Sequence, residues 1–171
     1  MMKQKMQDAF NEHLNAEAFS AHLYMSMSAY LQSINLKGMA SWMRLQANEE
    51  KLHEMKFYDF ILSRGGKVLL GKINAPPTEW ESPLEIFKAA YGHEQMITEK
   101  INKLVDLSLA ESDHASNAFL QWFVTEQVEE EESVLDVVDQ LTLIGKDQGA
   151  LFLIDRELGQ RVPSPATTQE A

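Results

Sequence analysis

The sequence contains no cysteine, so its fold has no disulfide bonds. Zinc ribbons and iron–sulfur clusters held by thiolates are excluded for the same reason. Basic residues are also scarce, because 15 Lys and Arg stand against 26 Asp and Glu and give a net charge of −11. Nucleic acids and anionic membranes bind basic faces, so we expect neither as a partner. An acidic chain is better suited to binding cations.

Long apolar runs are missing as well. No uncharged apolar stretch reaches the roughly 20 residues of a membrane span, and the N-terminus shows no secretory signal. Together with the lack of cysteine, this fits a reducing compartment, and we expect a cytoplasmic protein. A length of 171 residues suffices for one domain with a sizeable core. We therefore expect a single domain over 1–171.

Helical periodicity is the main feature of the sequence. Apolar residues recur at i, i+3, i+4 and i+7 over long windows, which predicts α-helices. The expected helices cover about 3–34, 37–64, 83–110, 113–143 and, much shorter, 147–158. Gly65-Gly66 is typical of a helix C-terminus, and Ser82-Pro83 of an N-terminus.

The connection over 65–82 holds two adjacent prolines and has no helical period. It is too long for a simple hairpin and suits a crossover along a bundle. The predicted fold is all-α, a four-helix bundle with a long crossover between its second and third helices and a short fifth C-terminal helix. The bundle would span about 3–143, and the polar tail over 162–171 is expected to be flexible.

Six polar residues interrupt the apolar stripes at mirrored spacings: Glu17, Glu50, His53, Glu94, Gln127 and Glu130. Glu50 follows Glu17 by 33 residues, and His53 follows Glu50 by three. Glu94, Gln127 and Glu130 repeat the same two intervals, each 77 residues after its counterpart. At about 100° per residue, these side chains fall on or beside the apolar faces of their helices. A polar residue in a helix usually faces solvent, but the apolar neighbours of these residues require burial.

Four buried carboxylates would be prohibitive without counter-charges, and no Lys or Arg occupies the neighbouring core positions. Two divalent cations would balance the four negative charges. Carboxylates with a single imidazole suit iron or manganese, which favours a redox-active metal pair over one structural ion. Glu50, placed between the other ligands, is the natural bridging carboxylate.

Three further acidic residues lie at the rim of these faces: Glu49, Glu126 and Glu129. They could form a secondary cation site beside the first pair, whereas Glu131 and Glu132 are expected to face solvent.

Tyr24 shares the face of Glu17. It could be a core tyrosine hydrogen-bonded to a carboxylate, or it could supply an electron or proton. We interpret His13, on the same face, as a satisfied core or interface histidine.

Glu17, the EEKLH of residues 49–53, Glu94 and the EQVEE of residues 126–130 resemble the bacterial non-heme ferritins over essentially the whole chain. Ferritin-like diiron bundles generally use one Glu from each of two helices and a Glu-x-x-His motif from each of the other two. The second motif reads QVEE here, whereas bacterioferritins and rubrerythrin-like proteins keep its histidine. Lys51 stands where bacterioferritins carry a heme-ligating Met, so we expect no heme.

The resemblance implies a role for each of these residues. Glu17, Glu50 and His53 would hold one iron, and Glu50, Glu94 and Glu130 the other. Gln127 would orient the site or a bound water. A third iron site would consist of Glu49, Glu126 and Glu129 together with Glu130. Tyr24 matches the redox tyrosine of the family.

The resemblance also implies an activity and an assembly. The protein would oxidise Fe(II) with dioxygen or hydrogen peroxide and store ferric oxide inside a homo-oligomeric shell of 24 subunits. The fifth helix would lie at the four-fold contacts, and Glu111 and Asp113 are candidates for lining a pore.

Two other functions stay open from the sequence alone. One is a diiron oxygenase or peroxidase that acts on a separate substrate. The other is a structural assembly with a degenerate metal site.

Overall fold

The structure, a computed structural model, describes residues 2–163 and contains five α-helices in that range: α1 (Gln4–Ser33), α2 (Lys37–Ser63), α3 (Pro83–Ala110), α4 (His114–Ile144) and α5 (Gln148–Leu158). The helix bounds lie within one residue of those expected, and the all-α prediction is confirmed. Most of the tail expected to be flexible, 164–171, falls outside the described residues. Within the described range, no helix is long and apolar enough to cross a membrane.

Local sequence signals set the helix ends. The side chains of Ser82, Asp113 and Asp147 cap α3, α4 and α5 by accepting backbone N–H groups of the first turn. Gly65 ends α2 with a left-handed φ of 68°, and the next N–H returns to the carbonyl of Ile61 at 2.9 Å. Asp113, a candidate pore residue, is buried in the single chain at its cap and paired with Arg64 at 3.0 Å.

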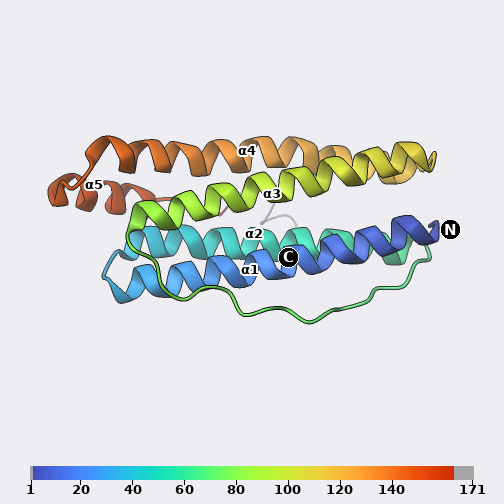
Figure 1. Cartoon of the computed structure of the whole chain (residues 1–171), viewed down its shortest axis with the longest axis horizontal. Helices are drawn as coiled ribbons and strands as arrows, with labels where there is room; N and C mark the ends of the chain where they lie inside the picture. Colours follow the sequence, from blue (N-terminus) through green and yellow to red (C-terminus); the bar gives the residue numbers. More distant parts are fainter. Residues whose placement is uncertain (1, 164–171) are drawn as a thin grey trace.

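Two antiparallel hairpins, α1–α2 and α3–α4, form the bundle, and the connection between them runs its full length (Figure 1). The connection has no regular structure, so its backbone needs other hydrogen-bond partners. Asn11 and Asn15 on α1 supply them. The Asn11 amide donates to the carbonyl of Lys67 at 2.9 Å and accepts from the N–H of Leu69 at 2.6 Å. Four residues later on α1, the Asn15 amide donates to the carbonyl of Leu69 and accepts from the N–H of Gly71.

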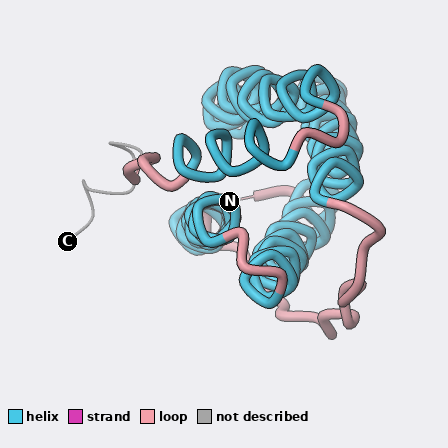
Figure 2. The backbone as a smooth tube through the Cα atoms, turned by 90° about the vertical axis from the view of Figure 1, so that its left-hand side faces the viewer, coloured by secondary structure: helices cyan, strands magenta, loops and turns pink. Residues whose placement is uncertain are grey.

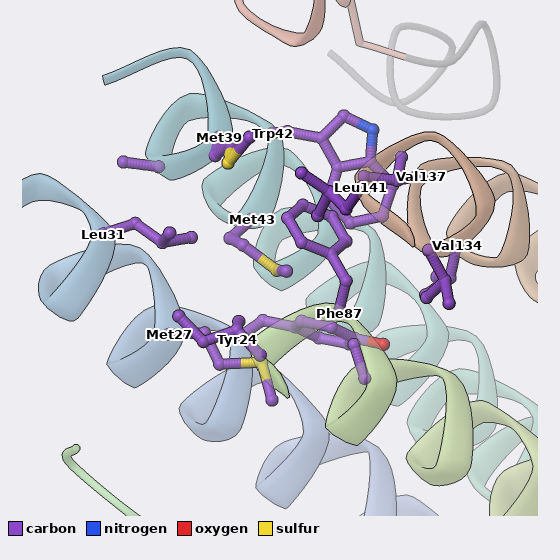
Figure 3. Packing of buried hydrophobic residues seen from close by; sticks show 14 of the residues in the cluster. Tyr24, Met27, Leu31, Met39, Trp42, Met43, Phe87, Val134, Val137 and Leu141 are labelled. Carbon is purple, nitrogen blue, oxygen red and sulfur yellow. The ribbon is translucent and has the colours of Figure 1, made fainter. Parts of the chain in front are cut away.

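The apolar core is divided in two. Near the α5 end, one cluster contains Tyr24, Met43, Trp42, Phe87 and Val134, contributed by all four long helices (Figure 3). At the opposite end, Phe10, Phe57, Ile101 and Phe123 belong to a second cluster, likewise built from all four. Between the clusters, each long helix contributes at least one buried polar residue of the mirrored set. The sequence interrupts its apolar stripes at mid-helix, and the fold stacks these interruptions into one polar layer.

The short helix α5 packs across the end of the bundle against α2 and α4 (Figure 2). Its Asp155 accepts the N–H of Met39 at 2.9 Å, which places a carboxylate at the N-terminus of α2. Gly38 makes this close approach possible, because an added Cβ would lie 1.6 Å from the Asp155 carbonyl oxygen. The end of α5 is therefore tied to the start of α2.

Candidate metal centre

The polar layer brings together the six residues of the mirrored set, and all six are buried. Glu17, Glu50 and His53 form one group whose ligand atoms all lie within 4.8 Å of one another. His53, Glu126 and Glu130 form a second such group that shares the imidazole. The two ring nitrogens of His53 face different carboxylates, Nδ1 at 3.7 Å from Glu50 Oε2 and Nε2 at 4.0 Å from Glu126 Oε1. Burial lowers the pKa of His53, so the imidazole is neutral and fit to ligate a metal.

Glu17 is the ionised member of the layer. His13 lies one turn before it on α1, and its Nε2 is 2.8 Å from Glu17 Oε1. Burial by itself would raise the pKa of Glu17, but the charge and hydrogen bond of His13, with smaller effects of His53 and Glu50, together lower the pKa to about 2. The other oxygen, Oε2, is buried and has no hydrogen-bond partner among the described residues. A bare, buried carboxylate oxygen of this kind suits a cation.

Glu94 on α3 is held by two neutral donors. The phenol of Tyr24 donates to Glu94 Oε1, and the amide of Gln127 donates to Oε2 at 3.1 Å. Burial nevertheless raises the pKa of Glu94 to about 7. Burial and the charge of Glu94 raise the pKa of Tyr24 well above its usual range, so the phenol keeps its proton. Both interpretations of Tyr24 left open by the sequence are compatible with this contact.

The remaining two central carboxylates also favour the protonated form in the absence of metal. Burial, followed by the charges of Glu94 and Glu17, raises the pKa of Glu50 well above its usual range. Burial and the charge of Glu94 raise the pKa of Glu130 to about 8, although Gln46 donates to it at 2.6 Å. These carboxylates repel one another, and a divalent cation between them would remove the repulsion.

The rim residues differ from one another. Glu129 is exposed and Glu126 is half-buried, as expected of a rim. Glu49 is not at the rim, because its side chain is only 7% exposed and pairs with Arg161 at 2.7 Å. Burial, and then the charges of Glu129 and Glu49, raise the pKa of Glu126, so the three carboxylates act on one another.

Sequence reasoning missed Gln46, which contacts Glu130, and Arg161, which contacts Glu49, and it did not foresee the contact of His13 with Glu17. His13 is not a satisfied histidine, because its buried Nδ1 has no partner among the described residues. A signal for two of them was present, since His13 and Gln46 each precede a mirrored Glu by four residues and so share its helix face. Arg161 lies beyond α5 and carries no such signal.

These residues fit a pair of iron ions. Within residues 2–163, no Lys or Arg forms a salt bridge with the four central carboxylates, which leaves their charge uncompensated if ionised. Oxygen ligands with one imidazole match iron, and each ligand is supported by a second polar contact or a neighbouring charge.

Comparison with known proteins decides the family. Residues 7–144 match the family described as Ferritin-like domain, which is most of the chain. The chain belongs to the ferritin family. The protein "Bacterial non-heme ferritin" of Bacteroides fragilis (strain 638R) is 42% identical over 94% of this chain and 100% of its own length. Its namesake from Staphylococcus epidermidis (strain RP62A) is 40% identical over 94% of this chain and 97% of its own.

Solved structures agree. The open pore ferritin of the archaeon Archaeoglobus fulgidus is 49% identical to this ferritin, with a TM-score of 0.94 over 95% of this chain and 100% of that one. This ferritin is therefore an iron-storage protein, and oxidation of Fe(II) at a diiron centre is the chemistry of its family. Among the three functions that the sequence left open, membership selects iron storage. The resemblance given by the EEKLH and EQVEE segments is confirmed.

Proposed function

We propose that the polar layer is the ferroxidase centre of this ferritin, with Fe(II) as its substrate. Glu17, Glu50 and His53 would bind the first Fe(II), and Glu50, Glu94 and Glu130 the second. Gln127, which donates to Glu94, would orient the site or a bound water. The observation that supports this most is the convergence of four buried carboxylates from four helices without matching Lys or Arg.

The reaction would take one electron from each of two Fe(II) ions. Hydrogen peroxide would accept the two electrons with two protons and leave as two waters, whereas dioxygen would leave as hydrogen peroxide. Reduction of dioxygen to two waters takes four electrons and four protons, so two more electrons would be needed beyond those of the iron pair. Tyr24, whose hydroxyl already donates to Glu94, is placed to supply one of them together with its proton, and a third Fe(II) would supply the other. Glu49, Glu126 and Glu129, with Glu130, would hold a third Fe(II) beside the pair.

The most direct test removes the two α2 ligands together, as Glu50→Ala with His53→Ala. The matched control, Glu12→Ala with His22→Ala, removes the same residue types from exposed positions of α1. Fe(II) oxidation, followed by the absorbance of ferric product after rapid mixing with oxygenated buffer, should lose its fast phase in the first variant only. If the first variant oxidises Fe(II) as fast as wild type, the assignment of the centre is wrong.

We further propose a cytoplasmic homo-oligomeric shell of 24 copies with α5 at its four-fold contacts. Large apolar side chains on and near α5 support an assembly, because Leu143, Phe152 and Leu153 are 87%, 59% and 64% exposed in the single chain. Light scattering coupled to size-exclusion chromatography should give about 470 kDa for 24 copies of a 19.5 kDa chain. A monomer or dimer would contradict storage in a cavity.

A further inference from the structure

Arg161 lies just past α5, yet it contacts Glu49, the buried neighbour of Glu50 in the polar layer. Successive turn hydrogen bonds continue the chain beyond the helix, from Gln160 N–H to the Glu157 carbonyl at 2.9 Å and from Arg161 N–H to the Leu158 carbonyl at 3.2 Å. The contacts of Gly38 and Met39 with Asp155 fix α5 against α2. The position of Arg161 is therefore set by the packing of two helices and not by a loose tail.

Its guanidinium is held between an aromatic ring and a carboxylate of α2. It lies 4.5 Å from the ring centroid of Trp42, and its Nη2 donates to Glu49 Oε2 at 2.7 Å. Trp42 and Glu49 are two turns apart on α2, so they present one surface to Arg161. The ion pair is largely shielded from water, with Arg161 24% and Glu49 7% exposed. Screening by salt is weak for such a pair.

The guanidinium is only partly satisfied in this position. Its Nη1 is buried and has no hydrogen-bond partner among the described residues. Arg–carboxylate pairs are frequently bidentate, with both arms of the planar fork engaged. An Arg held by one arm and a ring face can leave its carboxylate more easily than one held in a bidentate pair.

Arg161 is also the basic side chain that acts on the acidic cluster from outside the four long helices. Arg161 pairs directly with Glu49. The positive charge of Arg161 also lowers the pKa of Glu130, which opposes the effect of burial on that carboxyl. The cluster of Glu49, Glu126, Glu129 and Glu130 is the same one to which we assign the third Fe(II). A divalent cation in that site and a guanidinium on Glu49 would compete for one carboxylate and repel each other.

We propose that Arg161 is a built-in competitor of the third Fe(II): it neutralises Glu49 while the site is empty and withdraws when a cation binds. This inference rests on the proposed third site. Its consequence is that the third ion binds more weakly than the paired ions, so the third site fills last and releases its iron most readily. The chain thereby limits how tightly iron is held next to the centre.

The test is an anaerobic calorimetric titration of Fe(II) into the assembled, metal-free protein. Arg161→Gln should tighten the third binding event by about tenfold or more, because it removes a positive charge beside the ligand. The two tighter events should change much less, because Arg161 reaches their ligand Glu130 only through its charge. Arg156→Gln, which removes the same charge from an exposed position of α5, should match wild type. Arg161→Lys keeps the charge without the planar fork and should lie between them.

A double variant separates competition from general electrostatics. In a Glu49→Gln background, Arg161→Gln should change Fe(II) binding much less, because the shared carboxylate is gone and only the effect of its charge on Glu130 remains. Thermal unfolding of the metal-free protein gives a second readout. Arg161→Gln should lower the midpoint relative to wild type, since Glu49 loses a buried partner.

The outcomes distinguish this inference from the function on which it rests. An unchanged third event in Arg161→Gln, or no third event in any variant, overturns the role of Arg161 while the diiron assignment stands. A third event that appears only in Arg161→Gln supports it. If wild type itself shows no pair of tight Fe(II)-binding events, the proposed diiron centre is overturned instead. If Arg161→Gln fails to assemble, the comparison of Arg161→Lys with wild type decides.

Discussion

Single residues of the centre were predictable to the extent that they share a helix face with apolar neighbours. Glu17, Glu50 and Glu94 interrupt apolar stripes, and the structure buries each of them. Glu49 was misjudged as a rim residue, because a helical period does not reveal what a neighbouring segment will cover. The partner that covers it, Arg161, comes from a segment with no periodic relation to α2.

His13 offers a residue-level prediction. Its Nε2 contacts Glu17 Oε1, and it keeps the pKa of that carboxyl at about 2 against the opposing effect of burial. His13→Leu should raise the pKa of Glu17, so protons compete with Fe(II) and affinity for the first ion falls by about 10- to 100-fold near neutral pH, as second-shell losses usually do. His13→Gln, which can still donate to Glu17, should lose less.

Anaerobic Fe(II) titration of both variants measures this effect. His22→Leu serves as the control, because His22 is exposed on the same helix and bonds only to a backbone carbonyl of its own helix. Equal affinities for His13→Leu and wild type would show that His13 is a packing residue after all.

Helices as elements were predictable almost to the residue, because their ends carry strong chemical signals. Ser82, Asp113 and Asp147 cap the helices they precede, and Gly65 ends α2. What the sequence could not supply was the place where α5 docks. That position depends on a contact between Gly38 and the backbone at Asp155, and a helix start gives no sign of such a distant neighbour.

Gly38→Ala tests the docking of α5. The new Cβ would lie 1.6 Å from the carbonyl oxygen of Asp155, a backbone atom that cannot rotate away. We expect α5 to shift or detach, with a loss of about 1–3 kcal/mol in the free energy of unfolding, as for other overpacked sites. Because Arg161 follows α5, its pair with Glu49 should be weakened in the same variant.

The matched control is Gly92→Ala on α3, where nothing lies within 4 Å of the added Cβ. That change should be neutral or stabilise by about 0.5–1 kcal/mol, because Ala is the better helix former. Denaturant or thermal unfolding of the two variants under identical conditions makes the comparison. A Gly38→Ala protein as stable as Gly92→Ala would mean that α5 is not packed closely on α2.

For the whole molecule, the central fact is a core divided by a layer of acids. The two apolar clusters provide the favourable burial, while the layer between them works against folding unless protons or cations neutralise it. The net charge of −11 suggested a preference for cations, but composition alone could not say that the acidic groups are gathered inside. That information comes from the mirrored spacing and from the stacking of four helices.

The divided core predicts how the stability of the metal-free protein depends on pH. Glu94 and Glu130 have folded pKa values of about 7 and about 8, and the pKa of Glu50 is raised well above its usual range, so all three exceed the ordinary 4.5 of an unfolded Glu. Between the unfolded pKa of 4.5 and these folded pKa values, the three carboxyls hold more protons in the folded state than in the unfolded chain. Their contribution to stability therefore falls as pH rises. The lowered pKa of Glu17 acts in the opposite sense below about pH 4.5, and the lowered pKa values of His53 and His93 do so below their ordinary 6.5.

Unfolding midpoints of metal-free protein should therefore decrease from about pH 6.5 to about pH 8, and Fe(II) added without oxygen should restore them most at the upper end. Glu130→Gln stays neutral at every pH and keeps an oxygen for Gln46, so it should match wild type near pH 5 and exceed it near pH 8. Glu132→Gln, at an exposed position of the same helix, should follow wild type throughout. A midpoint that stays level or rises across this range would mean that the four carboxylates lie apart or already have counter-charges. The argument for iron as their natural partner would then fail.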